Sequence, residues 1–272
     1  MTTHDTIEGI RRALGPHRGR ATLGLVPTMG ALHDGHVALF REARRACNVI
    51  VASIFVNPAQ FNETTDLAAY PRDIASDAAI CAAAGVDHVF APSAAEMYPD
   101  GFATWIEPAG AAVGFEADWR PGHFRGVATV CLKLFTIVQP HIAFFGQKDA
   151  QQAAVVRQMV RDLNLPMEIR VIPTVRASDG LALSSRNARL SEEERIQARA
   201  VPRAIEAAQA AHRQGSDPVQ AARAALNGLD VQYVDVTRLD GRNTLVIAVR
   251  VGSTRLIDNT PLDSAPLVGA RS

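Results

Sequence analysis

Two histidines three residues apart are the first feature of the sequence that could do chemistry. His33 and His36 lie in the segment PTMGALHDGH (27–36), which follows the apolar run LGLV and opens a helical pattern. In a parallel sheet this is the carboxyl end of a strand, where ligands usually bind. Gly30 and Gly35 permit close approach of the backbone, and a helix start offers N–H groups to a phosphate. We interpret the segment as a phosphate-binding site. The alternatives are a turn with two incidental surface histidines, or a metal site, which would lack a third ligand nearby.

Two further segments carry cationic side chains. Lys148, in GQKD, follows a predicted strand and precedes a predicted helix. The helix dipole disfavours a cation there unless an anion is bound, so we favour phosphate binding over a solvated lysine. Arg186, in DGLALSSRN, stands beside two serine hydroxyls, and its guanidinium fork suits phosphate oxygens. By itself this second segment is equally typical of an ordinary surface loop.

Strand and helix patterns alternate over the first two thirds of the chain and must position these segments. Short, almost continuous apolar runs are typical of strands buried on both faces of a parallel sheet. We predict strands at 23–26, 49–56, 87–91, 142–145 and 168–175, and helices at 35–47, between Pro71 and Gly85, at 126–138 and at 149–164. This alternation predicts an α/β fold with a Rossmann-like, doubly wound parallel sheet.

The regular alternation of predicted strands and helices ends near Arg176. Ser191 begins a capping box that opens a long helix, and Pro202 should kink or restart it. Pro218 begins another helix, and two apolar or alternating runs follow, as in a small antiparallel pair of strands (231–236 and 244–251). We therefore predict a Rossmann-like domain at 1–176 and a smaller α+β domain at 177–272.

Composition excludes several classes of protein. The chain has 28 Lys plus Arg and 28 Asp plus Glu, and this balance argues against nucleic acid or an anionic membrane as the main partner. The hydrophobic fraction is 47%, which is ample for a folded core. Cys47, Cys81 and Cys131 are far apart and predict small buried side chains, with no disulfide framework or zinc site. The N-terminus lacks the apolar stretch of a signal peptide and no run is long enough to span a bilayer, so we expect a cytoplasmic protein.

Seven motifs together resemble the pantoate–β-alanine ligases. The histidine segment resembles the HIGH-type signature of α/β enzymes that act on the α-phosphate of a nucleotide. The other six are SIFVNPAQF (53–61), YPRD (70–73), RPGHFRGV (120–127), FFGQKDAQQ (144–152), DGLALSSRN (179–187) and RLIDN (255–259). The similarity runs in order from Leu23 to Asn259, and seven motifs in one order are far more specific than any one alone.

The resemblance implies an ATP-dependent condensation of (R)-pantoate with β-alanine. Pantoate attacks the α-phosphate of ATP to give pantoyl adenylate and pyrophosphate, and the amine of β-alanine then displaces AMP. The resemblance also implies that Mg²⁺ accompanies ATP and that the protein forms a homodimer. In the family, the smaller domain is expected to close over the ATP site of the nucleotide- and pantoate-binding domain. A carboxylate with a pKa near ~4 is already ionised at neutral pH and needs no general base. We therefore expect His33 and His36 to donate hydrogen bonds to phosphate oxygens, and the family's proton-donor position falls on His36.

The resemblance also assigns residues to each task. The expected catalytic residues are His33, His36, Lys148 and Arg186. The expected ATP-binding residues are Pro27, Met29, Gly30, Ala31, Leu32, His33, Asp34, Gly35, His36, Gly146, Gln147, Lys148, Asp149, Val175, Leu183, Ser184, Ser185 and Arg186. The expected pantoate- and β-alanine-binding residues are Gln60, Gln152, Asn57, Tyr70 and Arg120. A glutamine suits that task because it can donate to one ligand oxygen and accept from another.

Two positions depart from the family pattern. Gln147 stands where the family usually has Glu, and from the sequence we expect Gln147→Glu to be tolerated. Ser76 precedes Asp77 where the family has adjacent acidic residues, which leaves Asp77 as the expected magnesium ligand. Mg²⁺ accepts few protein ligands because it keeps several waters and takes substrate phosphates.

Two other functions remain open at this stage. One is a nucleotidyltransferase of the same superfamily that stops at a stable nucleotidyl product. The other is a catalytically silent binding protein of the same fold, which the loss of a charge at Gln147 would favour. Release of AMP that requires both pantoate and β-alanine would distinguish the ligase from both.

Overall fold

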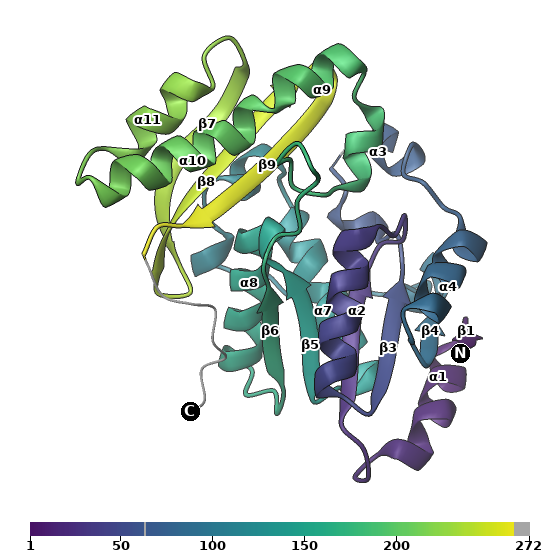
Figure 1. Ribbon diagram of the computed structural model, residues 1–272. Helices are drawn as coiled ribbons and strands as arrows, with labels where there is room; N and C mark the ends of the chain where they lie inside the picture. Colours follow the sequence, from purple (N-terminus) through teal and green to yellow (C-terminus); the bar gives the residue numbers. More distant parts are fainter. Residues whose placement is uncertain (63, 264–272) are drawn as a thin grey trace. The chain divides into compact units, whose positions relative to one another are not determined.

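The computed structural model describes residues 1–62 and 64–263, and its chain divides into two units (Figure 1). The first unit comprises Met1–Phe145 and Gln151–Ile172, and the second comprises Gly146–Ala150 and the chain from Pro173. The division after Ile172 lies close to the expected boundary at 176. The short excursion at Gly146–Ala150, which contains Lys148, was not expected from the sequence.

A six-stranded sheet forms the centre of the first unit. Its strands, in spatial order, are β1 (Thr2–His4), β4 (His88–Phe90), β3 (Val49–Ile54), β2 (Leu23–Thr28), β5 (Ile142–Gly146) and β6 (Glu168–Ile172). β2 pairs in parallel with β3 and β5, and β4 pairs in parallel with β1 and β3. The order reverses beside β2, and this switch point opens at the carboxyl ends of β2 and its neighbours, where doubly wound sheets bind ligands.

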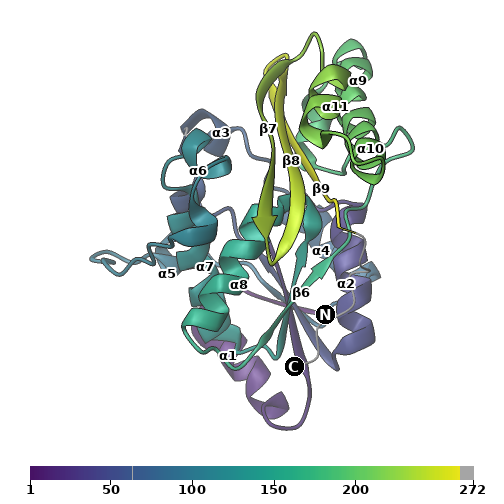
Figure 2. The ribbon, with the colours of Figure 1, turned by 90° about the vertical axis from the view of Figure 1, so that its left-hand side faces the viewer.

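Helices cover both faces of this sheet. The helices described in the first unit are α1 (Ile7–Leu14), α2 (Asp34–Ala46), α3 (Thr64–Ala68), α4 (Ile74–Ala83), α5 (Ala94–Met97), α6 (Glu116–Trp119), α7 (His123–Val138) and α8 (Ala150–Asp162). Figure 2 shows α2 on one side of the sheet and α7 and α8 on the other. The doubly wound arrangement predicted from the sequence is therefore confirmed.

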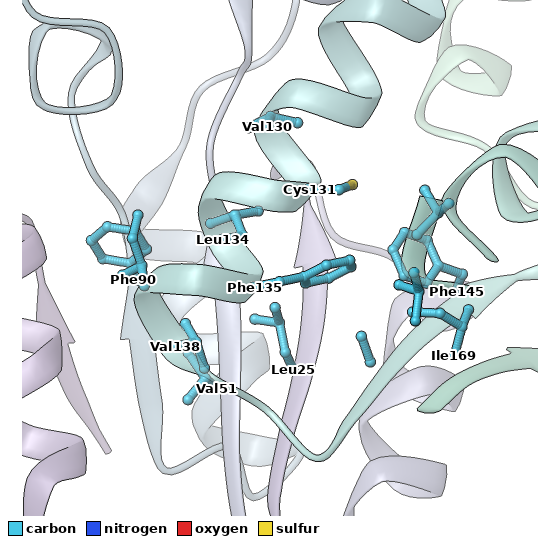
Figure 3. Close-up of a cluster of buried hydrophobic side chains, with 14 of the residues drawn as sticks. Leu25, Val51, Phe90, Val130, Cys131, Leu134, Phe135, Val138, Phe145 and Ile169 are labelled. Atoms are coloured by element: carbon cyan, nitrogen blue, oxygen red, sulfur yellow. The ribbon is translucent and has the colours of Figure 1, made fainter. Parts of the chain in front are cut away.

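Successive strand residues alternate between two apolar clusters. Leu25 and Val51 pack with Leu134 and Phe135 of α7 in the larger cluster, which Figure 3 shows in close-up. Ile50, one residue before Val51, belongs to the opposite cluster with residues of α2 and α4. Full burial of such a side chain contributes about 1.5–3 kcal/mol, so each face anchors its helices firmly. This packing fixes the positions at which the strands end and the candidate site begins.

The second unit contains a three-stranded antiparallel sheet and three helices. Its helices are α9 (Glu192–Ala198), α10 (Ala200–Arg213) and α11 (Pro218–Ala225), and its strands, in spatial order, are β7 (Asp230–Leu239), β8 (Arg242–Val251) and β9 (Thr254–Pro261). The helices and the sheet share one apolar cluster, which includes Leu245 and Ile247 of β8 and Ala204 of α10. The smaller α+β unit is thus confirmed, with one strand more than the predicted pair.

Several local expectations can be compared with the structure. The predicted restart of the helix at Pro202 is confirmed, because α9 ends at Ala198 and Pro202 lies in the first turn of α10. Cys47, Cys81 and Cys131 are buried and free, as predicted, and burial raises the pKa of Cys131 to about 12. Among the described residues, no helix has the length and apolar character needed to cross a membrane.

Candidate active site

The two histidines of the first motif cap helix α2 reciprocally. His33 is the N-cap residue, and its Nδ1 accepts a hydrogen bond from the backbone N–H of Gly35 at 3.1 Å. The Nδ1 of His36 accepts from the backbone N–H of His33 at 3.2 Å. Because each Nδ1 is an acceptor, the hydrogen of each neutral ring lies on Nε2. The helix cap therefore fixes both rings in the tautomer that offers an Nε2–H donor.

The capping box changes how this helix start can bind phosphate. The sequence predicted backbone N–H groups that are open to a phosphate at this helix start, but those of His33 and Gly35 are used within the box. The two imidazole rings, whose centroids are 4.2 Å apart, supply two neighbouring Nε2–H donors instead. Such a pair suits oxygens on which negative charge develops.

A buried carboxylate holds the loop that precedes the histidines. Asp77 of α4 is 3% exposed, and its two oxygens accept the backbone N–H groups of Ala31 at 3.0 Å and Leu32 at 2.8 Å. Gly30 and Ala31 both have positive φ angles, of 82° and 51°. A Cβ at Gly30 would lie 2.7 Å from Oδ2 of Asp77, so only glycine fits this turn beside the carboxylate.

This geometry gives Asp77 a structural task, and the magnesium binding expected of it stays a prediction. Both of its oxygens hold the loop, and moving the carboxylate away would leave two buried N–H groups unpaired. The donors belong to Ala31 and Leu32, two of the residues expected to bind ATP. Among residues 1–62 and 64–263, no three His, Cys, Asp or Glu side chains gather so that they could hold a metal ion.

A chain of buried amides connects the first motif with the second. Asn57 donates from Nδ2 to Oε1 of Gln60 at 3.0 Å, and Gln60 donates from Nε2 to Sδ of Met29 at 3.0 Å. The hydroxyl of Tyr98 donates to Oδ1 of Asn57 at 2.9 Å. Burial raises the pKa of Tyr98 well above its ordinary value, so the phenol stays protonated and remains a donor. The structure thus brings together three of the predicted residues, Met29, Asn57 and Gln60.

The main chain of Gln60 is held by two side chains of the RPGHFRGV motif. His123 Nδ1 lies 2.9 Å from the carbonyl oxygen of Gln60, and Arg120 Nη2 donates to the same oxygen at 3.3 Å. A Cβ at Gly126 would lie 2.2 Å from the carbonyl oxygen of Ala59, so α7 can approach this turn only with glycine at that position. Sequence reasoning missed Tyr98, His123 and Gly126. The last two lie within the RPGHFRGV motif, which was the available signal for them.

Two other predicted residues of the first unit, Tyr70 and Gln152, lie outside the hydrogen-bonded chain described above. Tyr70 is buried and packs edge-on against Phe61, with ring centroids 5.8 Å apart. Gln152 is partly exposed in the first turn of α8. Its neighbour Gln151 is the buried one, with Nε2 donating to main-chain carbonyls including that of Ala111 at 3.1 Å. Gln151 therefore supports the main chain, and the substrate binding expected of Gln152 stays a prediction.

The second unit carries the remaining candidate residues. The side chain of Lys148 is 19% exposed, and its Nζ lies 3.4 Å from Oδ1 of Asp149. Ser184 caps a 3₁₀ turn at Ser185–Arg189, with its Oγ accepting from the N–H of Arg186 at 3.2 Å. Leu183 donates from its N–H to the carbonyl of Val175 at 2.9 Å. Val175 and Leu183 are therefore main-chain neighbours.

Almost the whole chain is similar to proteins of one known family. A family model described as pantoate-beta-alanine ligase matches residues 2–261. The chain belongs to the pantoate–β-alanine ligase family. It is 50% identical over 272 residues to a pantothenate synthetase of Deinococcus radiodurans, and the match covers 91% of this chain and 96% of that protein.

Solved structures agree with this assignment. The crystal structure of a pantothenate synthetase from Thermus thermophilus is 44% identical, covers 96% of this chain and 99% of its own, and has a TM-score of 0.91. Pantoate–β-alanine ligase from Francisella tularensis, complexed with beta-gamma ATP and beta-alanine, is 35% identical, covers 98% of this chain and 99% of its own, and has a TM-score of 0.85. The family inferred from the seven motifs, the fold class and the ligase class are confirmed.

Proposed function

We propose that this chain condenses pantoate with β-alanine, using ATP and releasing AMP and pyrophosphate. The observation that supports this most directly is the reciprocal cap of His33 and His36, because it fixes two Nε2–H donors at the start of α2. A ligand at that position needs oxygens that gain negative charge during the reaction, and the α-phosphate of ATP is such a group.

The first step joins a carboxylate oxygen of pantoate to the α-phosphorus of ATP. The bond between that phosphorus and the bridging oxygen breaks, and pyrophosphate leaves with the electron pair. Because the carboxylate is already ionised, the protein's task is to stabilise charge and to align the reactants. His33 and His36 donate to the phosphate oxygens, while Lys148 and Arg186 supply positive charge to the same nucleotide.

Gln60 is the residue proposed to orient pantoate. Its Nε2 donates a hydrogen bond to the sulfur of Met29, which is a weak acceptor. The same N–H group can therefore donate to a ligand oxygen instead at small cost in free energy. Its Oε1 and main-chain oxygen are fixed by Asn57 and by His123. We also assign Gln152, Tyr70 and Arg120 to substrate binding.

In the second step the unprotonated amine of β-alanine attacks the carbonyl carbon of pantoyl adenylate. A C–N bond forms, the C–O bond to the phosphate breaks, and AMP leaves with the electron pair. Magnesium enters this proposal as the ion that accompanies ATP, whose phosphate oxygens can be its main ligands. Because the described side chains form no protein cage for it, no step is assigned to a protein-bound metal.

Incubation with ATP, Mg²⁺, pantoate and β-alanine tests the function directly. We expect pantothenate by mass spectrometry and AMP release that requires both organic substrates. A nucleotidyltransferase would not release AMP with these acceptors, and a silent binding protein would release none. A homodimer and a cytoplasmic location also stay predictions, the first testable by sedimentation equilibrium against the monomer mass of 29.2 kDa.

A further inference from the structure

The last of the seven motifs, RLIDN, lies within strand β9 and has no task in the proposed chemistry. Its final residue, Asn259, is 5% exposed, and its side chain contacts the 3₁₀ turn η4 (Gln147–Asp149). Asn259 Nδ2 donates to the carbonyl oxygens of Gln147 at 2.9 Å and Lys148 at 2.8 Å. Its Oδ1 accepts from Nε2 of Gln147 at 3.0 Å. One buried amide therefore makes three hydrogen bonds to two consecutive residues.

We propose that Asn259 is a positioning residue that fixes Lys148 for contact with phosphate; this rests on the proposed function. The main chain on both sides of the Lys148 Cα is held, because the carbonyls of residues 147 and 148 share one donor group. The Lys148 side chain is 19% exposed and leaves from this fixed point. A cation held in place before the nucleotide binds needs little reorganisation during the reaction.

The strand that carries Asn259 is itself firmly held. Its neighbour Asp258 is 3% exposed and accepts two hydrogen bonds from Arg176, at 2.6 and 3.1 Å. Asn259 pairs in register with Val246 of β8, a buried residue of the central strand. A functional side chain on a rigid strand is more accurately placed than one on a loop, so β9 suits this task.

The same geometry gives the neutral amide of Gln147 a partner. Carbonyl oxygens can only accept, so Nδ2 of Asn259 must face the two carbonyls and its Oδ1 must face Gln147. In this chain the amide at 147 therefore adds a third hydrogen bond between Asn259 and the turn, and the tolerance expected for Gln147→Glu stays a prediction.

The test measures the pantoate-dependent exchange of labelled pyrophosphate into ATP by the full chain. Asn259→Ala should reduce kcat/KM for ATP on the order of 10²-fold, the loss typical of a misplaced catalytic group. Thr260→Val is the matched control, because Thr260 is also buried on β9 and accepts one hydrogen bond, from Gln209 at 2.7 Å, but none of its hydrogen bonds reaches η4. We expect the control to stay within about threefold of the parent.

A double-mutant cycle separates positioning from a general structural role. In a Lys148→Ala background, Asn259→Ala should add less than about threefold, because the group it positions is gone. In an Arg186→Ala background, the substitution Asn259→Ala should keep its full effect on kcat/KM for ATP. An undiminished loss in the Lys148→Ala background would overturn the proposal, as would parental activity of Asn259→Ala.

Asn259→Asp provides a second test with nearly unchanged side-chain volume, and it decides the matter if Asn259→Ala does not fold. We expect a loss of at least about tenfold in kcat/KM for ATP, because a carboxylate cannot donate to the carbonyls of Gln147 and Lys148 and so releases the main chain of the lysine. Activity at or above that of the parent would contradict the proposal. If the parent itself makes no pantothenate, the proposed function fails; if the parent is active and both variants match it, only this inference fails.

Discussion

The histidines of the first motif show how a residue can serve the fold and the chemistry together. His33 and His36 cap α2 through their Nδ1 atoms, which places the hydrogen of each neutral ring on Nε2. The spacing of three residues predicted that both rings could face one ligand, but it could not predict the tautomer. The tautomer follows from the two capping hydrogen bonds, which form with the extended backbone of the N-cap residue His33.

At the same scale, Asp77→Asn tests the carboxylate that holds the loop. An asparagine would present N–H hydrogens to one of the two backbone donors, leaving that donor unpaired at a cost of about 1–3 kcal/mol. We expect the free energy of unfolding to fall by this amount and KM for ATP to rise. Chemical denaturation and exchange kinetics would measure the two effects.

Asp73→Asn is the control for that substitution. Asp73 is the N-cap of the same helix and accepts from the N–H of Ser76 at 3.0 Å, and asparagine is an equally good N-cap. We expect little change in this variant. Recovery of Asp77→Asn by excess Mg²⁺ would indicate instead that the carboxylate binds the metal.

At the scale of elements, the sequence predicted those that bury long apolar runs. β2, β3 and β5 are such strands, and α7 and α8 have clear helical spacing. β1 was missed because it has three residues, none of them buried. β9 was missed because polar residues interrupt its apolar ones, and several of these are buried against partners rather than exposed.

The contacts between elements explain why the rest of the site could not be predicted. Asp77 reaches Leu32 across 45 positions, and Tyr98 reaches Asn57 across 41. A single sequence gives no distance between such residues, so an acidic side chain near the YPRD motif was interpreted from family pattern alone. The close packing of α7 against Ala59 was likewise invisible without coordinates.

That packing gives a prediction of its own. Gly126→Ala would place a Cβ 2.2 Å from the carbonyl oxygen of Ala59, so η2 (Pro58–Gln60) must move away from α7. Overpacking of this kind costs about 1–3 kcal/mol, and the displaced Gln60 should raise KM for pantoate more than KM for ATP. Thermal unfolding and steady-state kinetics provide the readout.

Gly15→Ala is the matched control for this variant, since a Cβ there meets nothing within 4 Å. It should leave both KM values unchanged. Equal rises in the two KM values of Gly126→Ala would show that the substitution disturbs the fold generally and would remove the argument for a specific effect on Gln60.

At the scale of the whole molecule, a histidine pair at the sheet edge makes stability depend on pH. Nε2 of His4 lies 3.2 Å from Nδ1 of His88, and burial is the main cause that lowers the pKa of each ring below the ordinary value of 6.5. Asp5 and Asp87 oppose this shift, while His17 adds to it for His88. Below pH 6.5 the unfolded chain therefore binds more protons than the folded chain.

The free energy of unfolding should accordingly be unaffected by this pair above pH 6.5 and fall as the pH decreases below it. Denaturant titrations between about pH 5 and 8 would measure the slope, and His88→Gln should make it shallower. An unchanged slope in that variant would show that the pair does not contribute.

We propose that the capped histidines act on the α-phosphate before any amine arrives. The most direct measurement is the exchange of labelled pyrophosphate into ATP with pantoate present and β-alanine absent. We predict that the parent protein catalyses this exchange and that His36→Ala reduces it on the order of 10²–10³-fold, as for the loss of one preorganised donor. Parental exchange in His36→Ala with slow pantothenate formation would move the residue to the second step. No exchange by the parent under any condition would contradict the adenylate mechanism itself.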